Sequence, residues 1–218
     1  MINKQPTISI EELQDSRLTE IRSSLPEIKE IAGLKILVEP NVYNLGTDSY
    51  LCARTISIPK QARALDIGTG TGVLALKLAS LGASEVIGVD INPYAIKNAN
   101  KNKQLNDSKN VSFVVGNLFE HVMGKFDVIV YNPPYRNAEP IDEVSMCFYD
   151  SGHQSVKQFF EGLRTFLNPS GVAYLAWSNI GPLDLLPQLA AQHNLSIELL
   201  GTDFGRHGYE FYVYSLRF

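Results

Sequence analysis

The sequence Leu-Asp-Ile-Gly-Thr-Gly-Thr-Gly-Val at residues 65–73 is the most informative segment of the chain. Its three glycines, Gly68, Gly70 and Gly72, follow a short apolar run and precede a segment with helical periodicity at 73–81. Glycine lets the backbone turn sharply and approach a ligand closely. The pattern therefore predicts a strand, a tight turn and a helix, with a small-molecule site at the carboxyl end of the strand. A tight turn that binds nothing is the alternative.

The spacing of these glycines separates two classes of cofactor. A dinucleotide site requires G-x-G-x-x-G, whereas this chain has G-x-G-x-G and places Val73 where the third dinucleotide glycine would stand. An aspartate just before the glycines favours a ligand with cationic groups over a pyrophosphate, and S-adenosylmethionine carries a sulfonium and an ammonium. We therefore expect S-adenosylmethionine as the cofactor, with S-adenosylhomocysteine as the product. The segment supplies the predicted cofactor-binding residues Asp66, Gly68, Thr69, Gly70 and Gly72.

Beyond this segment, short apolar runs alternate with helix-length segments, which indicates a parallel sheet with helices on both faces. Two final strands, at 195–200 and 210–218, have no helix between them, so one of them must run antiparallel. The prediction is an α/β fold with a doubly wound, mostly parallel seven-stranded sheet, helices on both faces and a C-terminal antiparallel hairpin. The earlier strands are expected at 64–67, 86–89, 111–115, 126–131 and 172–177, and the helices between them at 73–81, 93–105 and 156–167.

The N-terminal part has a different pattern. Apolar residues in 8–32 recur at helical spacing and predict one or two amphipathic helices, with Pro26 opening the second and Gly33 ending it. A further helix is expected at 48–56, capped by Thr47 or Asp48. We therefore divide the chain into an N-terminal helical extension at 1–34 and an α/β domain at 35–218 that carries the predicted S-adenosylmethionine site.

Composition limits the remaining possibilities. The formal net charge of the 218 residues is −4, which argues mildly against binding a nucleic acid mainly through its phosphates. The lysines and asparagines of 97–109 are interpreted as a solvated helix face. The two cysteines, Cys52 and Cys147, are expected to be free thiols in a cytoplasmic protein, and no signal or membrane-spanning segment is visible. The four histidines show no metal-binding spacing, so no metal is expected.

Two further positions follow predicted strands. Asp90 ends the second strand about 20 residues after the glycines, where an acidic side chain can accept both hydrogen bonds of a ribose diol. The alternative, a cap for the helix that begins near Pro93, can be supplied by Asn92 instead. Asn117 and Leu118, after the third strand, could hydrogen-bond the adenine edge, although an asparagine there also suits a helix cap. The predicted cofactor residues from these segments are Asp90, Ile91, Asn117 and Leu118.

The segment Asn132-Pro133-Pro134-Tyr135 follows the fourth strand and indicates the reaction. Two prolines fix the backbone and remove two N–H donors, so the carbonyl of Pro133 is a fixed acceptor. The side-chain oxygen of Asn132 is a second acceptor, and together they can hold both hydrogens of an –NH₂ group. Tyr135 offers a ring face for a planar group. All four residues are predicted to bind the acceptor, with Asn132, Pro133 and Tyr135 catalytic and Asn132 also at the cofactor.

The glycine segment, Asp90 and the Asn-Pro-Pro-Tyr segment, in this order and spacing, resemble class I methyltransferases of the Asn-Pro-Pro-Tyr type. This group includes HemK-type protein glutamine N5-methyltransferases and enzymes that methylate adenine N6 or guanine N2. Three details are similar to the HemK-type enzymes: Val38-Glu39-Pro40 with Gly46-Thr47-Asp48-Ser49, Asp150-Ser151-Gly152, and Arg206-His207-Gly208-Tyr209-Glu210. The chain departs from the family at Asn117, where an aspartate is usual, and in its short N-terminal region.

The resemblance implies a Rossmann-like methyltransferase fold and methyl transfer to a planar amide or amine nitrogen. A protein glutamine side chain is the expected acceptor. A base amine of RNA or DNA and a small-molecule amine are the alternatives, nucleic acid being the less favoured. An inactive cofactor-binding subunit of a partner is the alternative from another class. The oligomeric state does not follow from the sequence.

Overall fold

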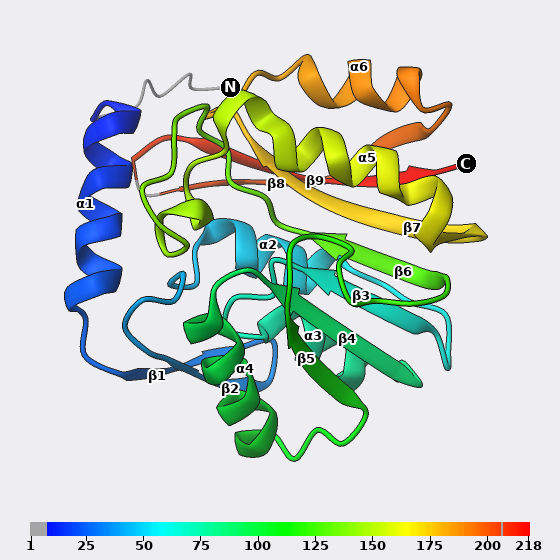
Figure 1. The fold of residues 1–218 in the computed structure, drawn as a ribbon, viewed down its shortest axis with the longest axis horizontal. Coiled ribbons are helices and arrows are strands. Elements are labelled where there is room, and N and C mark those ends of the chain that lie inside the picture. Colours follow the sequence, from blue (N-terminus) through cyan, green and yellow to red (C-terminus); the bar gives the residue numbers. More distant parts are fainter. Residues whose placement is uncertain (1–7, 206) are drawn as a thin grey trace.

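The computed structural model describes residues 8–205 and 207–218. Arg206, the first residue of the last segment that is similar to HemK-type enzymes, therefore lies outside the described residues. A seven-stranded sheet with the order β5-β4-β3-β6-β7-β9-β8 forms the centre of the molecule (Figure 1). Its strands run over Arg63–Ile67 (β3), Glu85–Asp90 (β4), Val111–Val115 (β5), Phe126–Tyr131 (β6), Leu167–Ser178 (β7), Ser196–Phe204 (β8) and Glu210–Arg217 (β9).

The predicted fold class is confirmed. Strand β3 pairs in parallel with β4 and β6, β4 with β5, and β6 with β7. The last strand, β9, is the antiparallel one, since it runs against both β7 and β8. The carboxyl ends of β3, β4 and β6 therefore meet at one edge of the sheet.

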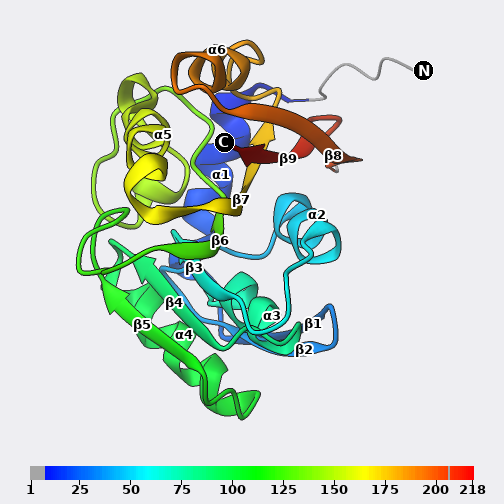
Figure 2. The ribbon, with the colours of Figure 1, turned by 90° about the vertical axis from the view of Figure 1, so that its right-hand side faces the viewer.

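Helices cover both faces of this sheet. Figure 2 shows α2 and α3 on one side and α5 and α6 on the other. Helix α6 lies between β7 and β8, in a region where the sequence predicted no element. The helices span Ile10–Ser23 (α1), Thr47–Thr55 (α2), Val73–Ser80 (α3), Pro93–Leu105 (α4), Gln154–Phe166 (α5) and Leu185–Gln192 (α6), with short 3-10 turns at Ser145–Cys147 and Ser151–His153. In the described part of the chain no helix is long and apolar enough to cross a membrane.

The second N-terminal helix that was predicted before Gly33 is wrong. Residues Glu27–Ile31 form strand β1, which pairs antiparallel with β2, Leu34–Val38. The connecting residues Ala32 and Gly33 have φ angles of 51° and 83°. Two consecutive residues with positive φ make the turn that joins hairpin strands, and this geometry outweighs the helical spacing of the isoleucines. The hairpin crosses the boundary predicted at residue 34, and that boundary remains a prediction.

The predicted cap of the next helix is also wrong. Gly46 is the residue before the first turn of α2, and it supplies no side-chain hydrogen bond. Thr47 is already helical, and the carboxylate of Asp48 accepts the N–H of Ser49 at 2.7 Å within the first turn. Asp48 is 2% exposed, so it is drawn inward rather than toward solvent.

Helix α4 is tied to β2 by a row of asparagines. The side-chain oxygens of Asn98, Asn102 and Asn106 accept the main-chain N–H groups of Glu39, Leu37 and Lys35 at 3.1, 2.7 and 3.1 Å. Asparagines four residues apart lie on one face of a helix, and alternate N–H groups of a strand lie on one edge, so the two periods match. The face of α4 that carries Asn98 and Asn102 is therefore buried, contrary to the prediction that the asparagines of 97–109 lie on a solvated helix face.

Candidate cofactor and acceptor site

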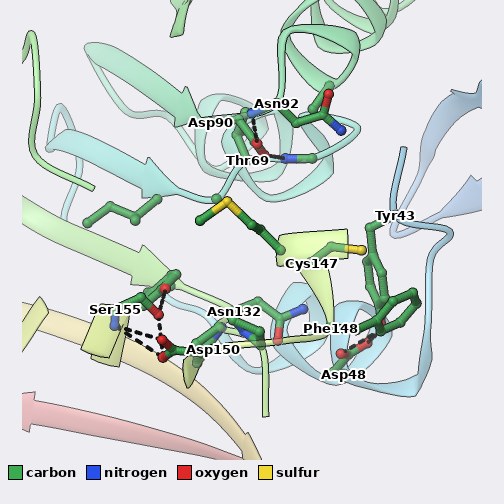
Figure 3. A pocket seen from close by; sticks show the side chains of 18 of the residues that line it. Tyr43, Asp48, Thr69, Asp90, Asn92, Asn132, Cys147, Phe148, Asp150 and Ser155 are labelled. Carbon is green, nitrogen blue, oxygen red and sulfur yellow. Dashed lines mark hydrogen bonds between the residues drawn. The ribbon is translucent and has the colours of Figure 1, made fainter. Parts of the chain in front are cut away.

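A cavity opens at the carboxyl ends of β3, β4 and β6 (Figure 3). Most of the predicted site residues line this one cavity, although they come from four separate segments of the chain. These residues are Gly68, Thr69, Gly70, Asp90, Ile91, Asn117, Leu118, Asn132, Pro133, Pro134 and Tyr135. Two predicted residues, Asp66 and Gly72, are not among the residues that line it.

The glycine turn has the backbone conformation that required glycine. Gly68, Gly70 and Gly72 have φ angles of 62°, 53° and 81°, in the left-handed region. A Cβ added to Gly72 would lie 2.8 Å from the ring of Phe113 and 3.0 Å from Cβ of Ala99. Gly72 therefore allows the turn to pack closely on β5 and α4, and its place in the cofactor site remains a prediction.

Asp66 lies behind the turn rather than in the cavity. It is 1% exposed, and its Oδ2 accepts the Thr69 hydroxyl at 2.6 Å and the Ala75 N–H at 2.9 Å. Burial raises the pKa of this carboxyl to about 7, against the lowering effect of the two hydrogen bonds. Asp66 thus holds the turn onto the start of α3, and its contact with the cofactor remains a prediction.

Asp90 connects the turn to the end of β4. Its Oδ2 accepts the N–H of Gly70 at 2.8 Å and its Oδ1 accepts the N–H of Asn92 at 2.9 Å. Burial raises the pKa of Asp90 to about 6, and the two main-chain donors oppose that shift. Asn92 caps α4 by accepting the N–H of Tyr94, as the sequence predicted. Each carboxylate oxygen can accept two hydrogen bonds, so Asp90 retains one site per oxygen for a diol.

The segment after β5 is a turn and not the start of an α-helix. The N–H of Asn117 donates to Oε2 of Glu120 at 2.9 Å, and Leu118 has a φ of 51°. Asn117 and the buried side chain of Leu118 both line the cavity.

The Asn-Pro-Pro-Tyr segment follows β6 directly. The Tyr135 hydroxyl donates to Oδ1 of Asn132 at 2.5 Å and lies 3.1 Å from Oδ2 of Asp48. The Tyr135 ring packs against Trp177 and Phe211, with ring centroids 5.7 and 6.1 Å apart. What Tyr135 directs toward Asn132 is therefore its hydroxyl, and its stacking role remains a prediction. Within the described residues no donor is hydrogen-bonded to the carbonyl oxygen of Pro133.

Several cavity residues were not predicted from the sequence. Tyr43 donates to Asp48 at 3.0 Å and meets Phe148 edge-on, with ring centroids 5.5 Å apart. Asp150 accepts both the N–H and the hydroxyl of Ser155. Tyr43, Phe148 and Asp150 come from loops, whereas Asp48 belongs to α2 and Ser155 to α5. Only Asp48 and Asp150 had a signal in the sequence, because they belong to the segments similar to HemK-type enzymes. Further residues that line the cavity are Leu13, Gln14 and Arg17 of α1, and Met146 and Cys147.

In the described part of the chain no group of three or more histidine, cysteine, aspartate or glutamate side chains is placed to hold a metal ion. The doubly wound sheet, the glycine turn, the acid at the end of β4 and the polar Asn-Pro-Pro-Tyr segment at one sheet edge define a class I, S-adenosylmethionine-dependent methyltransferase. The family described as "Methyltransferase domain" matches residues 58–198, and the chain belongs to this family. The predicted enzyme class and cofactor are thereby confirmed.

Two curated relatives are similar in sequence. The putative protein N5-glutamine methyltransferase of Methanocaldococcus jannaschii is 39% identical over 159 residues, which cover 70% of this chain and 80% of that protein. The release factor glutamine methyltransferase of Haemophilus influenzae is 35% identical over 138 residues. That match covers 54% of this chain and 46% of the longer enzyme.

Solved structures share the fold at low sequence identity. The 16S rRNA N2 G1207 methyltransferase of T. thermophilus, in complex with AdoMet and guanosine, has a TM-score of 0.67 at 21% identity. It covers 88% of this chain, and this chain covers 50% of it. The ribosomal protein L11 methylase of Lactobacillus delbrueckii has a TM-score of 0.60 at 23% identity, with 83% and 84% covered. At these identities the likeness shows the fold alone.

Proposed function

We propose that this chain transfers the methyl group of S-adenosylmethionine to the side-chain amide nitrogen of a glutamine in a protein. The observation that carries the proposal is the pair of acceptors at the cavity, Oδ1 of Asn132 and the carbonyl of Pro133. The M. jannaschii relative, whose name gives the same reaction, supports it over most of the length of both chains.

The cavity fits the cofactor. The carboxylate of Asp90 suits the ribose hydroxyls, and the turned peptide groups of Gly68 and Gly70 allow a close approach of the amino-acid part. Ile91 and Leu118 supply apolar surface for the adenine ring, with Asn117 at its edge. When bound, the cofactor supplies a methyl group already activated by the positive sulfur.

The chain's own contribution is to hold the acceptor amide. An amide nitrogen is a poor nucleophile because its lone pair is delocalised into the carbonyl group. Hydrogen bonds from its two hydrogens to Asn132 and Pro133 fix the nitrogen and favour the pyramidal geometry of attack. They strengthen as positive charge develops on nitrogen, so they stabilise the transition state more than the bound substrate. The proton can leave after transfer, and no strong base is needed beforehand.

Tyr135 holds Asn132, the first of the two hydrogen-bond acceptors, in place. Its hydroxyl donates to Oδ1 of Asn132, which fixes which end of the asparagine amide faces Tyr135. A carbonyl oxygen has two lone pairs, so Oδ1 can accept the substrate hydrogen as well. The hydrogen-bond acceptor Oδ1 of Asn132 is thus in position before the substrate amide binds.

The proposal includes a protein acceptor and a cytoplasmic location, the latter supported by the free thiols of Cys52 and Cys147. The test is transfer of a labelled methyl group from S-adenosylmethionine to separated protein, RNA and metabolite fractions. We expect label in protein, released as N5-methylglutamine on proteolysis. Label confined to RNA or to metabolites would overturn the proposed acceptor while leaving the methyltransferase class intact.

A further inference from the structure

Helix α1 contributes one wall of the cavity. Its residues Leu13, Gln14 and Arg17 line the same cavity as the Asn-Pro-Pro-Tyr segment. The helix stands at the edge of the sheet, next to the carboxyl-end loops, in both ribbon views (Figures 1 and 2). It therefore places polar side chains beside the reaction site from a part of the chain that carries none of the methyltransferase motifs.

Gln14 is the unusual residue of this wall. Its side chain is 3% exposed, yet Oε1 has no hydrogen-bond partner among the described residues. A buried polar atom without a partner destabilises the folded chain, and an apolar side chain of similar size would avoid that cost. An acceptor that is left open in a ligand cavity indicates a donor on the ligand.

Arg17, one turn later on the same face of α1, supplies hydrogen-bond donors where Gln14 supplies an acceptor. Its guanidinium carbon lies 5.3 Å from the ring centroid of Tyr43 and 5.7 Å from that of Phe148. The Tyr43 hydroxyl donates a hydrogen bond to Asp48. The Tyr135 hydroxyl lies within hydrogen-bond distance of both Asp48 and Asn132. Figure 3 shows Tyr43, Asp48 and Phe148 at the Asn132 end of the cavity, away from Asp90. The α1 wall therefore faces the acceptor amide rather than the ribose.

We propose that Gln14 and Arg17 bind the main chain of the acceptor protein beside the reactive glutamine. Oε1 of Gln14 accepts a peptide N–H, and the guanidinium of Arg17 donates to a peptide carbonyl. A peptide unit offers this donor and acceptor together, whereas both hydrogens of the reacting amide are taken by Asn132 and Pro133. The inference rests on the proposed function and adds how a peptide, as opposed to a free amide, is recognised.

The test is Gln14→Met, which keeps the side chain's length and removes the acceptor. Two quantities are measured with a glutamine-centred peptide: steady-state methyl transfer, and peptide binding to the protein loaded with S-adenosylhomocysteine. We expect the KM and the Kd for the peptide to rise about tenfold, the effect of one lost hydrogen bond. We expect kcat and the Kd for S-adenosylmethionine to stay within about twofold, since Gln14 touches neither reacting atom.

Thermal stability separates recognition from packing. Because Oε1 is buried and unpaired, we expect the Gln14→Met protein to unfold at the same temperature as wild type or higher. Gln104→Met, the same change at an exposed position of α4, is the matched control and should alter none of these values. A second probe, the peptide with its glutamine main-chain nitrogen methylated, should bind wild type more weakly and lose its difference between wild type and Gln14→Met.

The outcomes are distinct. An unchanged peptide KM in Gln14→Met, or a weakened Kd for S-adenosylmethionine instead, overturns the inference and leaves the proposed function standing. If wild type neither binds nor methylates the glutamine peptide while binding S-adenosylmethionine, the proposed function fails, and this inference fails with it.

Discussion

Asn132 owes its orientation to a single tyrosine hydroxyl. Because Tyr135 donates to Oδ1 at 2.5 Å, the asparagine oxygen is held in place before any acceptor binds. We expect Asn132→Ala to lower the single-turnover rate of methyl transfer by about 10²–10³, the usual effect of losing one preorganised contact to developing charge. The Kd for S-adenosylmethionine, measured by calorimetry, should change far less.

Two further variants sharpen this test. Asn132→Asp retains an acceptor at the same size but adds a charge, so we expect partial activity. Asn110→Ala, at the opposite end of the sheet before β5, is the control and should transfer at the wild-type rate. An Asn132→Ala protein with the wild-type transfer rate would remove the proposed mechanism.

Asp90 is expected to govern cofactor affinity and its dependence on pH. Asp90→Ala should weaken binding of S-adenosylmethionine by about 1–3 kcal/mol, because buried polar partners lose their acceptor. Since burial raises the pKa of Asp90 to about 6, affinity should fall as the pH drops below that value and the carboxylate loses acceptors. Asp203→Ala, at a half-buried acid of β8 that pairs with Arg54 and does not line the cavity, should leave binding unchanged. Equal affinity for wild type and Asp90→Ala would show that the ribose is held elsewhere.

At the residue scale, the sequence predicted the site best where a motif ends a strand. Asp90 and Asn132 follow apolar runs whose ends meet at one sheet edge, so their convergence follows from the topology. Asp66 and Gly72 belong to the same motif, but one side of a tight turn faces the protein. Which turn residues face the ligand depends on the contacts of Thr69 and Phe113, and spacing does not encode those contacts.

At the scale of the elements, the junction of α4 and β2 stabilises the fold and also holds Thr71, a residue that lines the cavity. The side-chain amide of Asn102 donates to the carbonyls of Leu37 and Thr71 while its oxygen accepts the N–H of Leu37. We expect Asn102→Ala to lower the free energy of unfolding by roughly 3 kcal/mol, since three hydrogen bonds are lost, one of them buried and two part-buried. Urea denaturation measures this loss. Asn100→Ala, on the exposed side of α4, should cost much less. Similar losses in both variants would mean that the row of asparagines adds little.

The sheet strands followed from apolar runs because parallel strands are buried on both faces. The strands expected at 111–115 and 126–131 have the predicted bounds. Strand β1 escaped prediction because it is mostly exposed and its isoleucines recur at a spacing that also suits a helix. Helix α6 escaped because no motif precedes its eight residues, which are too few to establish a helical period alone, whereas the glycine motif marks the start of the equally short α3.

At the scale of the whole molecule, the site is built from segments that meet only when the sheet is complete. The strand order places the glycine turn beside both Asp90 and Asn132. Helix α1, which precedes all of these segments in the sequence, lines the same cavity. The buried carboxyl of Asp66 lies close enough to the half-buried Asp90 that the negative charge of Asp90 raises the pKa of Asp66 further. The folded chain therefore carries an electrostatic cost at neutral pH that comes from the site.

This cost predicts how global stability depends on pH. The folded pKa of Asp66 is about 7 against 3.8 for the ordinary carboxyl, so between these values the folded chain keeps a proton that the unfolded chain releases. The stabilisation from Asp66 is thus full below about pH 4, declines as the pH rises, and is lost above about pH 7. At 1.36 kcal/mol per pKa unit the total change is roughly 4 kcal/mol.

Asp66→Asn removes this titration. Both donors to Asp66 reach the same oxygen, Oδ2, so an asparagine oxygen there can still accept the Thr69 hydroxyl and the Ala75 N–H. We expect urea denaturation to show Asp66→Asn gaining stability relative to wild type between pH 4 and pH 7, by up to roughly 4 kcal/mol, then a constant difference above pH 7. The outcome that would contradict this prediction is a difference in the free energy of unfolding that stays constant from about pH 4 to pH 7. Asp66 would then have a pKa near the ordinary value in the folded chain.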